Sequence, residues 1–210
     1  MAGLRNHWEW RGGWRPGRHK YACHLLPDDQ RDLRDLIGHY QEAVEQVQIL
    51  DPVPARWLHL TMQSIAFVDQ LDEDENQLGR VTETLRGRLA DFAAPTVTFH
   101  RPAIWTEAVV LQADPREPLY ELRLAVHDSV ADALNGTFTQ PRPQPGDFNP
   151  HVTIAYANSD APDDGPIRAA LRTVNPQPAT VKFPAASLIE LNRDHQMWEW
   201  TEVARLPFRA

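Results

Sequence analysis

The stretches His59-Leu60-Thr61-Met62 and His151-Val152-Thr153-Ile154 share one pattern, a His-x-Thr triplet followed by an apolar residue. Each copy lies in a short apolar run that is typical of a β-strand. Side chains alternate between the two faces of a strand, so in each copy the histidine and the threonine project from the same face. We therefore expect two imidazoles and two hydroxyls to face one cleft, an arrangement suited to metal-free general acid–base chemistry on a phosphate.

The repetition of so short a pattern needs support from its context, because composition alone predicts roughly 0.5 chance occurrences. The support comes from the opposite face of each strand, which is apolar in both copies: Leu58, Leu60 and Met62 in the first, Val152 and Ile154 in the second. The alternative interpretation is two structural strand histidines, with the threonines present for their β propensity. The two copies match in residue types and in the strand face from which these residues project, which favours a functional site over two structural histidines.

Composition limits the class of protein. The chain has 210 residues, 42% of them hydrophobic and 24% charged, which predicts a soluble globular protein of one domain or of two lobes sharing a cleft. No apolar run approaches the ~20 residues that cross a bilayer, and the N-terminus has no apolar signal region. The single cysteine, Cys23, excludes an internal disulfide and a cysteine-based zinc site. We expect a cytoplasmic protein that needs no cofactor.

The net charge of −8 argues against a protein that wraps long DNA or RNA. The charge is unevenly distributed, because residues 1–20 contain five basic side chains and only Glu9 as an acid, which gives +4 there and −12 in the remainder. A small anionic substrate in a locally positive cleft fits this distribution. We expect a small nucleotide or an RNA end as substrate, no long DNA, no membrane association and a monomer.

The order of predicted elements repeats along the chain. The expected helices cover residues 28–47, 72–92, 118–134 and 166–174, and the expected strands cover residues 21–26, 56–68, 96–100, 108–112, the second motif, 180–183, 186–191 and 197–203. A strand, a helix, a loop and a His-x-Thr strand follow one another twice. Pro27 precedes His59 by 32 positions and Pro118 precedes His151 by 33, which suggests an internal duplication.

This repetition predicts an α+β fold with two pseudo-symmetric lobes. Each lobe is an antiparallel sheet with helices on its outer face, and the lobes share a central cleft. We divide the chain into a Trp/Arg-rich N-terminal arm, residues 1–20, and a single bilobal domain, residues 21–210. The arm offers two alternatives: Trp8, Trp10 and Trp14 either stack on nucleobases or pack over the body of the protein, against Trp198 and Trp200.

The chain resembles the two-histidine (2H) phosphoesterase superfamily, which includes the bacterial 2′-5′ RNA ligase and RNA 2′,3′-cyclic phosphodiesterase families. The resemblance covers most of the chain. The residues that carry it are Leu25-Leu26-Pro27-Asp28, the stretch from Trp57 to Met62, the stretch from Asn149 to Tyr156, and Leu188-Ile189-Glu190-Leu191. The opening from His7 to Arg18 resembles an actinobacterial-type branch.

The resemblance implies a metal-independent phosphoesterase that opens 2′,3′-cyclic phosphates or cleaves 2′-5′ linkages. His59 and His151 would serve as the general acid and base, in an order that the sequence leaves open. Thr61 and Thr153 would bind the non-bridging phosphate oxygens. No third ligand has the spacing that would complete a metal site.

Three further residues are candidates for substrate binding. His24 lies on the first strand opposite Cys23 and Leu25, and either faces the cleft or is a structural histidine. Tyr156 either lines the cleft or packs in the core. Trp57 and Gln63 share the parity of His59, so we expect their side chains at the rim of the cleft. For Trp57 the alternative is a place in the core or in the wall of the cleft.

Other functions remain open from the sequence. The same site running in reverse would make an RNA 2′-5′ ligase. A non-catalytic nucleotide- or RNA-binding module would keep the cleft without turnover, but binding alone does not need two proton-transfer groups. An interaction domain would use the Trp-rich arm as its contact surface.

Overall fold

The structure, a computed structural model, describes residues 3–27, 30–72 and 76–209. Asp28, the last residue of the Leu25–Asp28 motif and the expected start of the first helix, lies outside the described residues. The helices are α1 (Arg31–Val44), α2 (Gln77–Leu89), α3 (Glu117–Leu134) and α4 (Gly165–Leu171). The strands are β1 (Lys20–Leu25), β2 (Leu50–Pro52), β3 (Leu60–Phe67), β4 (Thr96–Phe99), β5 (Ala103–Trp105), β6 (Ala108–Asp114), β7 (His151–Ala157), β8 (Ala179–Lys182), β9 (Ala185–Asn192) and β10 (Glu199–Pro207).

The strands form one curled sheet in the order β10-β9-β1-β3-β7-β6-β4-β8, with β2 paired to β7 and β5 to β6. Every pair of neighbouring strands is antiparallel. The two repeats appear as β1-α1-β3 and β6-α3-β7, and the strands that carry the motifs, β3 and β7, are neighbours at the centre. The boundary between the two lobes is therefore the line along which the two motifs meet.

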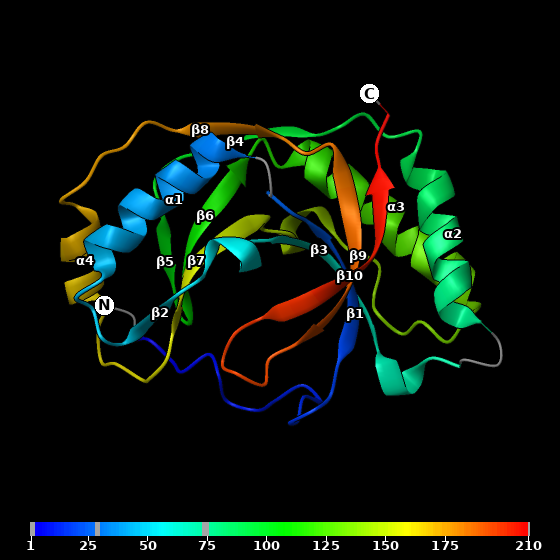
Figure 1. Cartoon of the computed structure of the whole chain (residues 1–210), viewed down its shortest axis with the longest axis horizontal. Coiled ribbons are helices and arrows are strands. Elements are labelled where there is room, and N and C mark those ends of the chain that lie inside the picture. The colour runs from blue at the N-terminus through cyan, green and yellow to red at the C-terminus, as the bar shows by residue number, and fades with distance from the viewer. Residues whose placement is uncertain (1–2, 28–29, 73–75, 210) are drawn as a thin grey trace.

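The helices lie on the outer surface of the curled sheet, two over each lobe (Figure 1). Helix α1 packs on β7, β8 and α4, whereas α3 packs on β3 and α2. Each repeat thus places its helix on the lobe that contains the motif strand of the other repeat. This exchange ties the two lobes together through buried apolar contacts.

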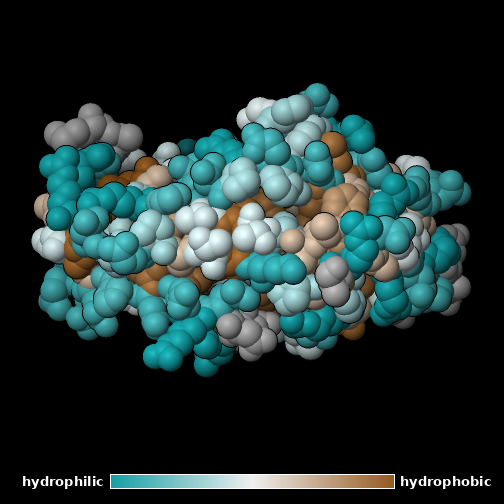
Figure 2. Space-filling view, turned by 90° about the horizontal axis from the view of Figure 1, so that it is seen from above, coloured by the Kyte–Doolittle hydropathy of each residue, from teal (hydrophilic) through white to brown (hydrophobic). Residues whose placement is uncertain are grey.

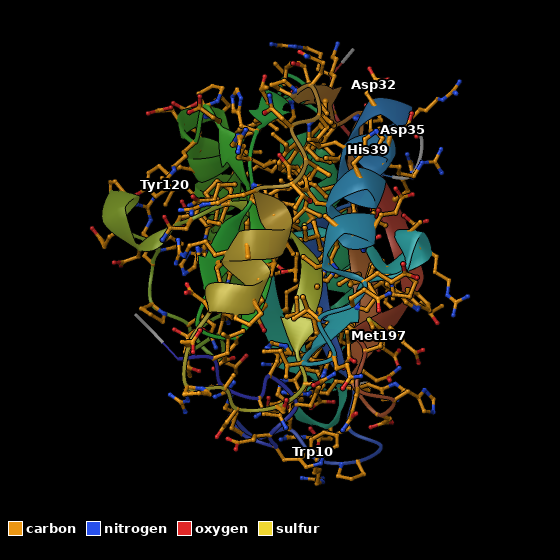
Figure 3. The ribbon with its side chains drawn as sticks, turned by 90° about the vertical axis from the view of Figure 1, so that its left-hand side faces the viewer. Trp10, Asp32, Asp35, His39, Tyr120 and Met197 are labelled. Carbon is orange, nitrogen blue, oxygen red and sulfur yellow. The ribbon has the colours of Figure 1, made fainter. Side chains whose placement is uncertain are left out.

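Helix α1 is held by a regular apolar stripe. The side chains on this stripe are fully or almost fully buried: Leu33, Leu36, Ile37, Tyr40 and Val44. Their three- and four-residue spacing puts them on one face of the helix, and the polar residues Asp32, Asp35 and His39 lie on the outer face (Figure 3). The helix exists because this stripe is buried against the sheet, since a helix of this length is marginal in isolation.

The predicted fold class is confirmed, and the element boundaries differ in particular places. The first motif strand was expected from Arg56, but β3 begins at Leu60, because Pro54 is followed by a 3₁₀ turn over Ala55–Trp57. The short strands β2 and β5 were not predicted. Three residues are too few to show strand periodicity, and β2 ends in a proline.

The N-terminal arm passes below the ends of the strands before it enters β1, in dark blue at the bottom of Figure 1. Leu4 forms a bridge with Ala161. Trp8 is buried and donates its indole N–H to Asp51 over 3.0 Å. Trp10 is 45% exposed and lies on the outer side of the arm (Figure 3). The arm tryptophans therefore do not act as one surface.

The surface seen in Figure 2 is mostly hydrophilic, with hydrophobic atoms visible in the strips between polar side chains. Over the three described ranges, none of the helices combines the length and the apolar character that crossing a bilayer requires.

Candidate active site

The two motifs meet across one antiparallel pair, in which Leu60 of β3 lies opposite Val152 of β7. Extended by one residue in each direction, this register sets His59 beside Thr153 and Thr61 beside His151. All four side chains line one cavity of about 590 Å³. The structure thus brings together the two motifs that the sequence singled out.

The two histidines are held in the same way. The Nδ1 atom of His59 donates to the carbonyl oxygen of Trp57 over 2.8 Å, and that of His151 donates to the carbonyl oxygen of Asn149 over 2.8 Å. A carbonyl only accepts, so the proton of each neutral ring is on Nδ1. Neither Nε2 has a hydrogen-bond partner among the described residues. Each Nε2 is therefore free to accept or donate a proton.

Burial lowers the pKa of both histidines. Desolvation lowers the pKa of His59 to about 4, against the raising effect of its hydrogen bond to Trp57, and His151 adds a smaller lowering effect. Desolvation also lowers the pKa of His151, against the hydrogen bond to Asn149. Both rings therefore lose a proton more readily than a free imidazole, which favours their neutral forms near neutral pH.

β-Bulges decide which further side chains face the cavity. On β3 the partners of β1 skip from Thr61 to Gln63 and from Ser64 to Ala66, so each step inserts one extra residue. Ser64 consequently lines the cavity, three positions after Thr61. Gln63, which simple alternation places on the site face, is instead buried and donates to the carbonyl oxygen of Ser64.

A β-bulge has the same effect on β7. There the partners of Val109 and Val110 are Ala155 and Thr153, which leaves Ile154 as the extra residue. Tyr156 therefore returns to the site face three positions after Thr153 and lines the cavity. Burial raises the pKa of its hydroxyl, against the lowering effects of its hydrogen bond with Thr153 and of the nearby Arg193.

His24 lies behind the first motif. Its ring stacks on that of His59, with centroids 4.5 Å apart and planes 9° from parallel, and its Nε2 is 3.4 Å from Oγ1 of Thr61. The side chain is 2% exposed, and desolvation followed by the nearby His59 lowers its pKa well below the ordinary value. His24 is therefore neutral at pH 7.

The position of the His24 proton follows from its surroundings. Its Nδ1 is buried and has no hydrogen-bond partner among the described residues. A proton on Nε2 leaves only a lone pair unpaired at Nδ1, whereas the other tautomer leaves a buried N–H without an acceptor. We therefore assign Nε2–H as the donor to Thr61. The hydroxyl proton of Thr61 is then available to a ligand.

Trp57 is placed differently from the other candidates. Its ring is not part of the cavity lining; it packs edge-on against Trp200, with centroids 4.9 Å apart. Trp200 in turn contacts the ring of His59 at 5.1 Å. The contact of Trp57 with the site is thus the hydrogen bond that its carbonyl accepts from His59.

Sequence reasoning missed His7, Lys20, Trp105 and Glu107, which all line the cavity. It left Trp14 open between stacking on a base and packing on the body, and the ring of Trp14 lines the cavity as well. The ring of Trp105 lies 4.4 Å from that of His151. No local sequence pattern links these residues to the two motifs, because contacts between segments far apart in the sequence bring them to the site.

His7 fixes the arm to the cavity wall. Its Nδ1 donates to Glu107 over 3.2 Å, and its Nε2 accepts from the indole of Trp198 over 3.0 Å. The ring stacks on Tyr156 at 4.3 Å. Desolvation and the nearby Arg193 lower its pKa to about 4, which leaves it neutral. Trp14 meets Trp198 edge-on at 5.2 Å, so the arm extends the wall as a row of aromatic rings.

No group of three or more His, Cys, Asp or Glu side chains within the described ranges is arranged to hold a metal ion. The polar groups of the cavity are instead suited to donating hydrogen bonds and exchanging protons. Such a set fits an anion whose charge changes during a reaction.

Comparisons with known proteins agree with this geometry. Apo LigT of E. coli has a TM-score of 0.63 and 16% identity, over 92% of this chain and 99% of that one. LigT complexed with 3′-AMP has a TM-score of 0.63 and 19% identity over the same shares. A protein of Thermus thermophilus has a TM-score of 0.60 and 19% identity, over 92% of this chain and 98% of that one.

At these identities the likeness concerns the fold alone. No curated protein matches the sequence. The model of the 2′-5′ RNA ligase superfamily matches residues 26–195, which is most of the chain and includes both His-x-Thr motifs. The chain therefore belongs to the 2′-5′ RNA ligase superfamily, the two-histidine phosphoesterases.

Proposed function

We propose that the protein opens 2′,3′-cyclic phosphates, or cleaves 2′-5′ linkages, of small nucleotides or RNA ends by acid–base catalysis between His59 and His151. One observation carries this proposal. Two imidazoles have their Nδ1 protons fixed by backbone carbonyls, and both present an unengaged Nε2 to one cavity. Nucleotide binding alone does not require such a pair.

The proposed reaction is a displacement at phosphorus. A water molecule attacks the phosphorus atom and forms a new P–O bond while Nε2 of His59 takes its proton. The P–O bond to the ribose 2′ or 3′ oxygen breaks, and Nε2 of His151 gives that oxygen a proton. We assign the role of base to His59 because desolvation lowers its pKa to about 4 and leaves its ring neutral, and His151 is then the acid. Proton exchange with solvent restores the starting state.

The threonines stabilise charge on the phosphate. Thr61 receives a hydrogen bond from His24 and directs its own proton to a non-bridging oxygen. Thr153, on the other side of the line between β3 and β7, also directs its hydroxyl proton to a non-bridging oxygen. Hydroxyl groups held before the reaction stabilise the additional charge of the transition state without reorganising.

The remaining cavity wall favours a nucleoside attached to that phosphate. Half-exposed rings of Trp14, Trp105 and Trp198 line it, and stacking of a base on an aromatic ring contributes about 1–3 kcal/mol. Among the structural relatives, LigT has been crystallised with 3′-AMP and with ATP. These ligands belong to that protein, and they support the expectation that this cavity accepts nucleotides.

The test is hydrolysis of the four nucleoside 2′,3′-cyclic phosphates by the wild-type protein, in parallel with and without EDTA. We expect turnover that EDTA does not reduce, and the position of the product phosphate identifies the leaving oxygen. Oligonucleotides with 2′-5′ linkages are assayed beside them. Tight nucleotide binding without turnover of any of these compounds would overturn the proposal in favour of a binding module, and joining of RNA ends without hydrolysis would favour a ligase.

A further inference from the structure

Lys20 is the first residue of β1, and its side chain lines the cavity. Its ammonium lies over two aromatic rings, 4.3 Å from the centroid of Phe67 and 5.6 Å from that of Trp14. The residue is half-buried. Apart from the histidines, Lys20 is the only one of the described residues that both lines the cavity and carries a positively charged side chain at neutral pH.

The ammonium of Lys20 has no carboxylate partner within the described residues. Three acidic side chains of the described residues around the arm and β1 are engaged with other partners: Asp69 with Arg18, Glu190 with His19, and Glu107 with Arg11 and His7. Desolvation lowers the pKa of Lys20, and the nearby Arg18 lowers it further; among the described residues, no carboxylate raises it again. A half-buried cation in this condition is stabilised by an anion that enters from outside.

The place of Lys20 in the sheet sets its distance from the reacting centre. Lys20, Ala22 and His24 alternate along β1 with their side chains on the cavity face, and the register of β1 with β9 is unbroken over this stretch. Four residues of a strand span about 13 Å. His24 lies behind Thr61, so Lys20 is at the opposite end of the cavity from the two His-x-Thr motifs and from the position of the proposed reacting phosphate. The rings of Trp14 and Trp198 line the wall there as well.

We propose that Lys20 binds a second phosphate of the same substrate, the phosphate on the 5′ oxygen of the nucleoside whose 2′,3′-cyclic phosphate lies between His59 and His151. The proposal rests on the proposed function for the position of the reacting phosphate. It narrows the substrate to a nucleotide with phosphates at both ends of the ribose, as at the 3′ end of an RNA strand. Lys20 is then a specificity-determining residue.

The test measures binding without turnover, so that it does not depend on catalysis. Adenosine 3′-phosphate, adenosine 3′,5′-bisphosphate and the dinucleotide ApAp are titrated calorimetrically into the wild-type protein, Lys20→Met and Lys182→Met. Lys182 is the other lysine of the chain and is exposed on β8, so its substitution is the matched control. Methionine keeps the length of the side chain and its contact with the rings while it removes the charge.

We expect the wild-type protein to prefer the bisphosphate over the monophosphate by about tenfold, the usual value of a charge-assisted contact that is partly exposed. Lys20→Met abolishes this preference and Lys182→Met retains it. A similar preference for ApAp shows that an internal phosphodiester serves as the second phosphate, and a preference for the bisphosphate alone assigns the site to a terminal phosphate.

Equal binding of the monophosphate and the bisphosphate by the wild-type protein would overturn the inference, as would an unchanged preference in Lys20→Met. Failure of the proposed function gives a different result, because the hydrolysis assay is then negative while the Lys20-dependent preference persists.

Discussion

Leu60 of β3 and Val152 of β7 form the pair that joins the two lobes of the sheet, and each is the central residue of a His-x-Thr motif. Because the strands are antiparallel, this pair relates the two motifs by a local pseudo-two-fold rotation. Each histidine then has the threonine of the other motif beside it. In the proposed reaction, a phosphate on this axis has one imidazole on each side, as proton transfer to and from opposite oxygens requires.

The pH dependence of the reaction follows from the lowered histidine pKa values. The productive free protein has His59 neutral and His151 protonated, and both pKa values lie below 6.5. We expect a bell-shaped profile of kcat/KM with its maximum between about pH 4 and pH 6.5, because His151 loses its proton as the pH rises further. Steady-state kinetics on a nucleoside 2′,3′-cyclic phosphate measures this profile. A maximum above pH 7.5 would contradict the account.

Folding stability depends on pH through the same burial. The pKa values of His7 and His59 are lowered to about 4 in the folded protein and lie near 6.5 in the unfolded chain. Between these values the unfolded chain binds more protons, so the free energy of unfolding falls as the pH decreases from about 6.5 to about 4. Each group contributes a slope of up to about 1.4 kcal/mol per pH unit. Above about pH 6.5 the contribution of these two groups to the free energy of unfolding is fully present and no longer changes with pH.

Urea unfolding at several pH values measures this slope. His59→Gln makes the slope shallower by the contribution of one proton, and so does His7→Gln. His39→Gln is the control, because His39 is exposed on the outer face of α1 (Figure 3). An unchanged slope in both His7→Gln and His59→Gln would show that these rings are not the source of the pH dependence.

The role assigned to His24 predicts coupling to Thr61. His24→Phe keeps the stacking on His59 and removes the donor, so kcat falls by about tenfold, the loss of one hydrogen bond to a group that acts on the transition state. In the Thr61→Val background the same substitution changes kcat little, because the hydroxyl that His24 orients is absent. Independent, multiplicative effects in the double-mutant cycle would exclude positioning through Thr61.

The arm tryptophans differ in their contribution to stability. Trp8 is buried and donates to Asp51, so Trp8→Ala lowers the free energy of unfolding by about 3–5 kcal/mol. Trp10, two residues away and 45% exposed, is the matched control, and Trp10→Ala costs under about 1 kcal/mol. Denaturant titration distinguishes them. Equal costs would mean that the arm is not anchored through Trp8.

Alternation along a strand was sufficient to predict the four central side chains of the site. His59, Thr61, His151 and Thr153 lie within three residues of one another in each motif, and no bulge falls between them. Alternation failed beyond the first bulge of each strand. It placed Gln63 on the site face where Ser64 lies, and it could not decide Tyr156, because a bulge depends on pairing with a neighbouring strand that the local sequence does not display.

The remaining wall of the cavity was beyond prediction for a different reason. His7, Lys20 and Trp105 reach the site through contacts between segments far apart in sequence. Composition showed that residues 1–20 are basic and rich in tryptophan, but it could not separate the buried Trp8 from the exposed Trp10 or from Trp14 at the cavity. That separation depends on tertiary packing.

The most direct test of the account compares kcat/KM for a nucleoside 2′,3′-cyclic phosphate in His59→Ala, His151→Ala, the double variant and the exposed control His39→Ala. We predict a loss of about 10²–10⁴-fold in each single variant, a double variant far more active than the product of the two losses implies, and an unchanged control. Retention of wild-type activity by either His59→Ala or His151→Ala would contradict the two-histidine mechanism.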